Sequence, residues 1–346
     1  MKINMKDIAR KNYGLISIIV IYLWIYILSI LLSQETFTTF YRSYFFAWMK
    51  KMFVPISNWI SLPFLYVIIV IFVFSIIRKS IQKGIKNGLI LLFKWLVLLF
   101  CWFYILWGFN YKCTTLSHSF STSGNIITHS ELVDRYIKSV NILNTIKQVN
   151  IKFKVDENEL LSQLNTTEIE LLKKYNYKNI SSSRLKKLEP KGVLLRFSTS
   201  GFYFPFGFEG YYDAGLHELQ LPFTMAHEMA HGFGITDEGE CNFLAYLACQ
   251  SSSNDVLKYS AEMSLYAYLK RYIPKEVRDT LIGLNEFVKK DITAISSQMD
   301  LYPDILPDLR NLIYDQYLKS NGVSTGINSY STFVQMIIHY EKLIEN

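Results

Sequence analysis

Residues 221–232 read LPFTMAHEMAHG and contain the pattern H-E-x-x-H from His227 to His231. Good helix formers fill this stretch and Pro222 stands near its start, so we expect a helix. Residues four apart share one face of a helix, so both imidazoles can reach one metal ion, with Glu228 beside them to receive a proton. A chance match in a chain with 6 histidines has a likelihood on the order of one in 200. The alternative is that these side chains only pack.

A zinc site that performs hydrolysis has three protein ligands and one open position, so a third ligand is needed. Gly232 and Gly234 are expected to end the first helix. Asp237 can then cap a second helix that runs from Glu238 to about Gln250. The third ligand is sought on this second helix.

Glu240 shares a helix face with apolar residues, namely Phe243, Leu244 and Leu247. A carboxylate on such an inward stripe needs a partner, which a metal would supply. Glu238 gives a weaker inward signal, since it aligns with Cys241, Asn242 and Ala245. We therefore expect His227, His231 and Glu240 to bind Zn²⁺. The alternative is that Glu240 only completes a capping box with Asp237.

The N-terminal third of the chain predicts a membrane anchor. The sequence is 50% hydrophobic with a mean hydropathy of +0.16, more apolar than a soluble protein usually needs. Three apolar segments each approach the roughly 20 residues that cross a bilayer: Gly14–Ser33, about Asn58–Ile77 and Gly88–Trp107. Their single charged residue, Lys94, can reach toward the head groups. The stretch Phe40–Phe53 could be an interfacial helix or a simple linker.

Basic residues beside the spans predict the orientation. They gather at the N-terminus and in the loop after the second span: Lys2, Lys6, Arg10 and Lys11, then Arg78, Lys79, Lys83 and Lys86. Both regions should be cytoplasmic, although the other loop also carries Arg42, Lys50 and Lys51. Three crossings would leave the region from Phe109 onward outside the cytoplasm.

Charge divides the chain into two parts. Residues 1–108 hold 12 basic and 2 acidic residues, a net of +10, and residues 109–346 hold 24 and 27, a net of −3. The basic part suits an anionic lipid bilayer, and the mildly acidic part offers no footprint for nucleic acid. The expected organisation is a three-helix transmembrane region over 1–108, a linker over 109–127 and a catalytic domain over 128–346.

The domain after the linker is expected to be mostly α-helical, an α+β, zincin-like domain with a small sheet. Thr128 and Glu131 form a plausible capping box for a helix to about Gln148, and a second helix should cover Glu157–Tyr175. Short aromatic and glycine-containing runs predict strands at Val193–Ser198, Gly201–Phe204 and Leu216–Leu221. Helical periodicity then continues to the C-terminus.

Other polar residues are weaker candidates for a site. A donor for the oxyanion could come from Tyr266, Tyr314, Tyr317 or Tyr330, but packing is the commoner role among 24 tyrosines. His217 is expected to be a half-buried strand residue, and the other histidines (His118, His129 and His339) have no ligand spacing. The four cysteines show no zinc-ribbon spacing.

The run from His227 through Gln250, with ECNFLAYLAC at 240–249, resembles the bacterial membrane family known as domain of unknown function 3810. That family shows H-E-x-x-H followed by E-A-N-F-x-A-Y-L. The likeness extends to the apolar spans, to the approach at Gly201–Leu221 and to the C-terminal stretches Tyr314–Lys319 and Gly326–Tyr330. Cys241 stands where the family commonly has alanine. The resemblance implies zinc-peptidase character with Glu240 as third ligand, and no known substrate.

The sequence as a whole favours a membrane-anchored zinc metallopeptidase that hydrolyses peptide bonds with zinc-activated water, Glu228 being the general base. Its substrate would be a peptide or protein segment near the membrane. One alternative is a sensor or signalling protein whose H-E-x-x-H domain acts on a cytoplasmic regulator. Another is a metal-stabilised envelope interaction module without enzymatic activity. A motif outside any apolar run of membrane length disfavours an intramembrane protease.

Overall fold

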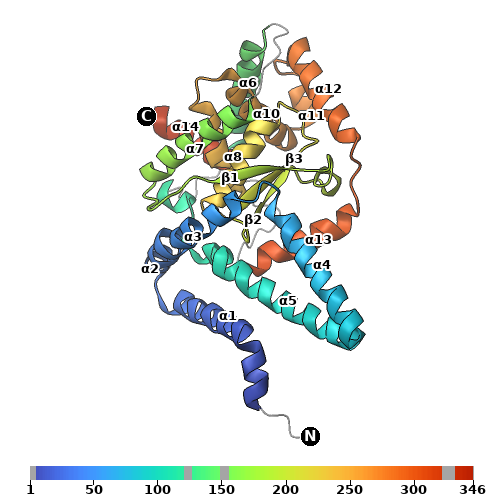
Figure 1. Ribbon diagram of the computed structural model, residues 1–346. Coiled ribbons are helices and arrows are strands. Elements are labelled where there is room, and N and C mark those ends of the chain that lie inside the picture. The colour runs from blue at the N-terminus through green and yellow to red at the C-terminus, as the bar shows by residue number, and fades with distance from the viewer. Residues whose placement is uncertain (1–4, 121–126, 149–155, 322–331, 346) are drawn as a thin grey trace. The chain divides into compact units, whose positions relative to one another are not determined.

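The computed structural model describes residues 5–120, 127–148, 156–321 and 332–345. The chain forms two compact units. Unit 1 contains Met1–Thr114 together with Phe204–Glu209, and unit 2 contains Thr115–Tyr203 and Gly210–Asn346. Helices dominate the described residues, and a single small sheet accompanies them (Figure 1).

Unit 1 has three helices that are long and apolar enough to cross a membrane, α1 (Met5–Leu31), α4 (Phe64–Lys83) and α5 (Ile85–Leu106). The prediction of three such segments is confirmed. The second segment begins later than expected, because helix α3 (Ala47–Asn58) ends at the predicted start and Pro63, with φ −51° and ψ 126°, directly precedes α4. Gly84, with φ +83°, then separates α4 from α5.

The chain between α1 and α4 is helical, and it covers the stretch Phe40–Phe53 for which an interfacial helix or a linker was expected. It consists of α2 (Gln34–Thr38), the π-helix η1 (Thr39–Phe46) and α3. The short 3₁₀ helix η2 (Gly108–Lys112) follows α5. Tyr41 of η1 donates its hydroxyl to the carbonyl of Ile105 at 2.9 Å, which joins this helical stretch to α5.

The segment Phe204–Glu209 is the turn of a β-hairpin and packs within unit 1. The ring centroid of Phe208 lies 5.9 Å from that of Phe46 and 6.0 Å from that of Phe53. The amide of Phe64 donates to Glu209 Oε2 at 3.0 Å, and Glu209 is fully buried. Aromatic packing and a buried carboxylate therefore fix the hairpin turn among the helices of this unit.

Unit 2 opens with the 3₁₀ helix η3 (Ser117–Phe120) and two helices that match their predictions. Helix α6 (His129–Ile146) begins at the capping box formed by Thr128 and Glu131, and helix α7 (Glu157–Lys174) begins at the cap Asp156. Part of the predicted linker, residues 121–126, lies outside the described residues.

The sheet has three strands, β1 (Arg184–Leu188), β2 (Gly201–Phe204) and β3 (Glu209–Asp213), in the order β1-β3-β2. The predicted strand at Gly201–Phe204 is confirmed as β2. It lies at one edge of the sheet, and its short turn into β3 makes the pair an antiparallel hairpin.

Two other strand predictions are wrong. Residues 193–198 contain the 3₁₀ helix η4 (Leu195–Phe197), because the buried carboxylate of Asp213 gathers the amides of this loop. Asp213 accepts from Gly192 and Leu194, both at 2.7 Å, and from Leu195 at 3.2 Å. Residues 216–220 form a turn that leads into helix α8, in which the amide of Gln220 donates to the carbonyl of His217.

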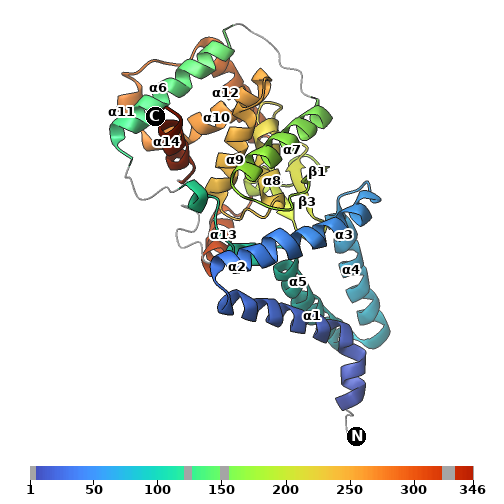
Figure 2. The same cartoon turned by 90° about the vertical axis from the view of Figure 1, so that its left-hand side faces the viewer.

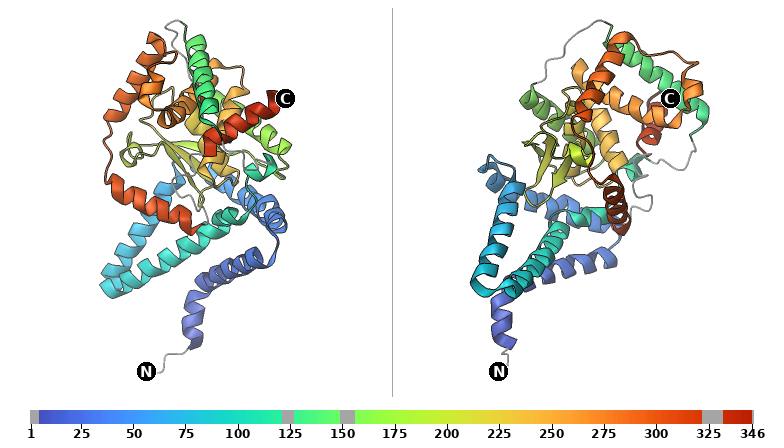
Figure 3. Two further views of the ribbon diagram at one scale, coloured as in Figure 1. Left: turned by 180° about the vertical axis from the view of Figure 1, so that it is seen from behind. Right: turned by 90° about the vertical axis from the view of Figure 1, so that its right-hand side faces the viewer.

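The remaining helices of unit 2 carry most of its core. They are α8 (Leu221–Gly232), α9 (Glu238–Gln250), α10 (Asp255–Tyr272), α11 (Lys275–Arg278), α12 (Glu286–Asp300), α13 (Pro307–Ser320) and α14 (Thr332–Glu345). Helix α9 contacts α8, α10 and α14 (Figure 2). Helix α6, drawn in green, runs beside the red C-terminal helix α14 (Figure 3).

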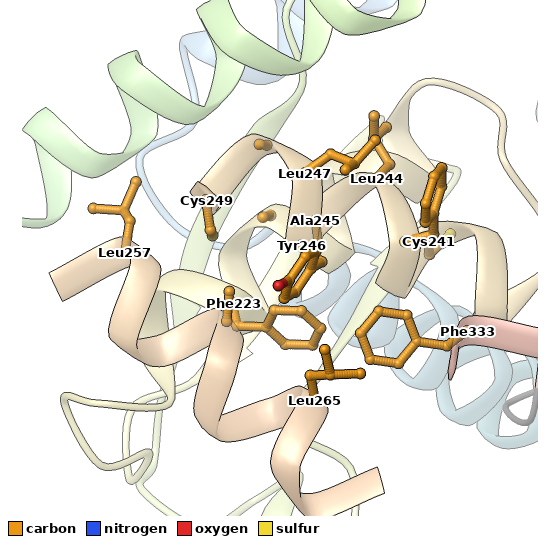
Figure 4. Packing of buried hydrophobic residues seen from close by; sticks show 14 of the residues in the cluster. Phe223, Cys241, Leu244, Ala245, Tyr246, Leu247, Cys249, Leu257, Leu265 and Phe333 are labelled. Atoms are coloured by element: carbon orange, nitrogen blue, oxygen red, sulfur yellow. The ribbon is translucent and has the colours of Figure 1, made fainter. Parts of the chain in front are cut away.

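A cluster of aromatic rings locks α8 to its neighbours (Figure 4). Phe333 of α14 is fully buried, and its ring centroid lies 6.1 Å from Phe223 of α8 and 6.2 Å from Tyr246 of α9. Full burial of each such ring contributes roughly 1.5–3 kcal/mol. The core thus fixes α8 and α9 relative to each other, and these two helices carry the sequence motif.

A buried polar network joins α6, α9 and α10. Arg135 of α6 forms an ion pair with Glu262 of α10 at 2.9 Å, and both side chains are almost fully buried. Tyr246 of α9 donates to Glu262 at 2.9 Å, and Ser139 contacts the same carboxylate at 2.5 Å. Because a buried charge without partners is costly, the network favours a single arrangement of α6, α9 and α10.

Candidate metal centre

Three potential donor atoms of His227, His231 and Glu238 lie within 4.8 Å of one another. Glu238 Oε2 is 3.1 Å from Nε2 of His227 and 3.6 Å from Nε2 of His231. His231 and Glu238 are buried, and the side chain of His227 is 14% exposed. The two imidazoles come from successive turns of α8 and the carboxylate from the first residue of α9.

Hydrogen bonds hold both imidazoles with Nε2 toward Glu238. His227 Nδ1 lies 2.8 Å from Asn242 Oδ1, and His231 Nδ1 lies 2.9 Å from the carbonyl of Ile235. A carbonyl oxygen can only accept, so Nδ1 of each ring carries a proton. Such partners orient the histidines of metal sites in proteins.

The turn between α8 and α9 is built by local sequence signals. Gly234 adopts φ +87°, the left-handed conformation that commonly ends a helix, and its amide donates to the carbonyl of His231 at 2.9 Å. Asp237 then caps α9 by accepting from the amide of Glu240 at 3.0 Å. This short connection brings Glu238 back beside the motif helix.

Glu240 does not lie with the histidines, which corrects its expected place in the site. Its carboxylate accepts hydrogen bonds from the amides of Leu116, at 2.9 Å, and Ser117, at 2.7 Å. The burial of Glu240, 4% exposed, therefore has a structural cause: it fixes the first residues of unit 2 to α9. Glu238 occupies the position beside His227 and His231 instead.

The electrostatics of Glu238 follow from its neighbours. Burial alone would raise the pKa of this carboxyl group, but the imidazoles of His231 and His227 lower the pKa well below its usual value. Glu238 is therefore a carboxylate at neutral pH. The ionised carboxylate is the form in which a glutamate binds a metal.

Glu228 is buried beside the three donors and is 4% exposed. Burial raises the pKa of its carboxyl group to about 7, although His227 and His231 oppose the shift. Its Oε2 atom has no hydrogen-bond partner among the described residues. A group with a pKa near neutrality and a free oxygen can take up and release protons.

Glycines on two strands make room for Glu228. A Cβ atom at Gly201 of β2 would lie 2.4 Å from the carbonyl oxygen of Tyr211 and 2.7 Å from Glu228 Cγ. At Gly210 of β3, a Cβ atom would lie 3.3 Å from Glu228 Cβ. The edge strand β2 therefore runs directly against the general-base candidate.

Gly201→Ala is expected to destabilise unit 2 by about 1–3 kcal/mol, the usual cost of overpacking a core, because the carbonyl of Tyr211 cannot move aside cheaply. The measurement is the free energy of unfolding of the purified protein. Gly283→Ala is the matched control, since a Cβ atom at this exposed position meets nothing within 4 Å. Equal stability of the two variants would contradict the packing.

Among the tyrosines considered as oxyanion donors, Tyr314 of α13 reaches the site. Its hydroxyl donates to Glu238 Oε1 at 2.5 Å. Tyr317 stacks on Tyr314, Tyr266 packs against Tyr136, and Tyr330 lies outside the described residues. His217 is half-buried as expected, but in a turn, where its Nδ1 accepts from the amide of Leu219. The four cysteines are free thiols.

The donors of this cluster fit a metal ion of the kind that nitrogen and oxygen ligands bind. Two histidines and one glutamate form a three-ligand set known from zinc hydrolases. The buried, unsatisfied oxygen of Glu228 beside this set indicates that a further polar group belongs there.

Comparison with known proteins gives a family match. No curated protein matches the chain, and no solved structure matches it. The family model described as "Protein of unknown function (DUF3810)" matches residues 41–338, which cover parts of both units and every residue of the candidate metal centre. The chain belongs to this family.

Proposed function

We propose that the protein is a membrane-anchored zinc metallopeptidase. The observation that carries the proposal is the cluster of His227, His231 and Glu238, with the buried carboxyl group of Glu228 next to it. Zinc bound by the three residues would lower the pKa of a water molecule to about 7 and polarise a substrate carbonyl.

Glu228 would supply the proton transfers of the reaction. With a pKa of about 7, its carboxylate accepts a proton from the attacking water and returns it to the leaving amine. Its position between α8 and the glycines of β2 and β3 keeps bulk water away from the carboxyl group. Tight packing against Gly201 and Gly210 also limits the positions that the side chain can take.

The proposed substrate is an extended peptide segment. Strand β2 is an edge of the sheet, and an edge strand can pair with the backbone of a peptide through main-chain hydrogen bonds. Gly201 of β2 lies against Glu228, so a peptide paired with β2 would pass close to the proposed base. The sequence predicted a strand at Leu216–Leu221, but this stretch is not a strand, so β2 is the edge proposed to bind the peptide.

Among the alternatives, a purely structural metal site would need ligands but no base. The buried, unsatisfied Glu228 favours a catalytic site over such a module, since an uncompensated carboxyl group costs stability without a use. A signalling protein that acts on a cytoplasmic regulator would keep the same chemistry. It differs in the side of the membrane on which unit 2 stands.

Unit 2 is proposed to be extracytoplasmic. Basic residues precede the first span and surround the α4–α5 turn, so both regions should be cytoplasmic, and a third crossing then places unit 2 on the other side of the membrane. A C-terminal alkaline phosphatase fusion, active only outside the cytoplasm, should therefore be active. A fusion to a reporter that works only in the cytoplasm should stay silent. The reverse pattern would favour the signalling alternative.

The proposed function is tested by comparing proteomes of cells that produce either the wild type or Glu228→Gln at equal levels. Cleaved fragments of membrane-proximal proteins should be present with the wild type and absent with the variant. Addition of a permeant zinc chelator to wild-type cells should reproduce the loss. Identical fragment patterns in all three samples would refute the peptidase proposal.

A further inference from the structure

Helix α13 places one side chain at the candidate metal centre from far along the sequence. Tyr314 stands 76 residues after Glu238 and donates its hydroxyl to Oε1 of that carboxylate at 2.5 Å. The other oxygen, Oε2, faces both imidazoles. The two oxygens of Glu238 therefore have different tasks, one toward α13 and one toward the histidines.

We propose that Tyr314 is a positioning residue that holds Glu238 so that Oε2 alone is presented to the metal. The inference rests on the proposed metal site and adds to it the residue that fixes its third ligand. With it, each of the three ligands has its own orienting partner: Asn242 for His227, the carbonyl of Ile235 for His231 and Tyr314 for Glu238.

The surroundings of Tyr314 suit this role. A phenol hydroxyl is a neutral donor, so it can satisfy Oε1 without neutralising the negative charge that a metal needs. Tyr314 is half-buried, and its ring stacks on Tyr317 with centroids 6.2 Å apart and an interplanar angle of 19°. Stacking within one helix limits the positions that the hydroxyl can take.

Loss of the hydroxyl frees Oε1 to rotate or to compete with Oε2. Partners that orient metal ligands typically contribute about 10-fold to 100-fold in metal affinity. Tyr314→Phe keeps the ring and its stacking on Tyr317 but removes the donor. We therefore expect the zinc dissociation constant of this variant to rise by about 10-fold or more, while one zinc ion is still bound at saturation.

The experiment titrates zinc into the purified full chain in detergent against a competing chelator. Tyr317→Phe is the matched control, because it changes the same kind of ring on the same helix without removing the hydroxyl on Glu238. The same proteins loaded with Co²⁺ report ligand geometry through visible absorption. Tyr314→Phe should shift that spectrum and the zinc affinity, and Tyr317→Phe should shift neither.

The unfolding midpoint of the metal-free proteins separates positioning from folding. Equal midpoints for the wild type and Tyr314→Phe, together with weaker zinc binding in the variant, support the proposal. Wild-type affinity and an unchanged cobalt spectrum in Tyr314→Phe would overturn it while leaving the metal site intact. A wild type that binds no zinc would instead refute the proposed function itself, so the two failures are distinguishable.

Discussion

Glu238→Gln is expected to abolish zinc binding, whereas Glu240→Gln should still bind zinc. Glu238 Oε2 lies 3.1 Å and 3.6 Å from the two Nε2 atoms, and an amide oxygen is a far weaker zinc ligand than a carboxylate. The loss should exceed the roughly 100-fold that an orienting partner contributes. Zinc content per chain after dialysis, measured by mass spectrometry, gives the result directly.

Glu240→Gln tests a different contact and serves as the control. An amide has one acceptor oxygen where the carboxylate offers two, so one of the amides of Leu116 and Ser117 is left without its partner. An unsatisfied buried donor costs about 1–3 kcal/mol, so this variant should unfold more easily with its zinc retained. Zinc lost from Glu240→Gln and kept in Glu238→Gln would restore Glu240 as the third ligand.

Glu228→Gln is expected to bind zinc like the wild type but to lose hydrolysis. The amide preserves the shape of the side chain between Gly201 and the motif helix, and it removes the group that accepts the proton. General bases typically contribute about 10² to 10⁴ in rate. The measurement is turnover of any substrate fragment found in the proteomic comparison, with zinc content determined on the same samples.

A second variant serves as the matched control for the loss of a carboxylate. Glu218→Gln removes an exposed carboxylate from the turn before α8 that is not part of the donor cluster, and should leave turnover unchanged. If Glu228→Gln turned over substrate at the wild-type rate with its zinc in place, the proposed chemistry would be wrong. The site would then be a structural metal centre.

The sequence predicted the motif helix and its neighbours well because their signals are local. The H-E-x-x-H spacing depends only on helix periodicity, and α8 forms where it was expected. Caps at Thr128 and Asp237 also lie next to the helices they start. Three apolar segments were found for the same reason, since length and composition suffice to recognise them.

The choice between Glu238 and Glu240 depended on a difference between a buried and an exposed face, which α9 does not have. The apolar stripe marks the inward face only when the other face meets water, and every residue of α9 except the last is buried. The weaker stripe of Glu238, Cys241 and Asn242 is the one that faces the motif: Cys241 Sγ lies 3.3 Å from His231 Nδ1, and Asn242 bonds His227. Asn242, an asparagine within an apolar helix, was the sequence signal that could have identified this face of α9 as the one toward the motif.

Two strands were predicted wrongly and others were not predicted, and in both cases the conformation depends on long-range contacts. Residues 195–197 form a 3₁₀ helix because Asp213 accepts hydrogen bonds from the amides of this loop. The local sequence pattern does not indicate such a contact. Strand β1, with the sequence RLKKL, contains three basic residues in five and lacks a β-branched residue. Its pairing with β3 gives it its conformation.

The sequence separations of the contacts around the candidate metal centre also set an order of assembly. His227, His231 and Glu238 lie in one short stretch, whereas the bonds of Glu240 to Leu116 and of Tyr314 to Glu238 span 124 and 76 residues. Loop closure costs more as separation grows, and local contacts form first. During folding, the helical hairpin α8–α9 can thus bring His227, His231 and Glu238 together early, and the distant partners then hold them in place.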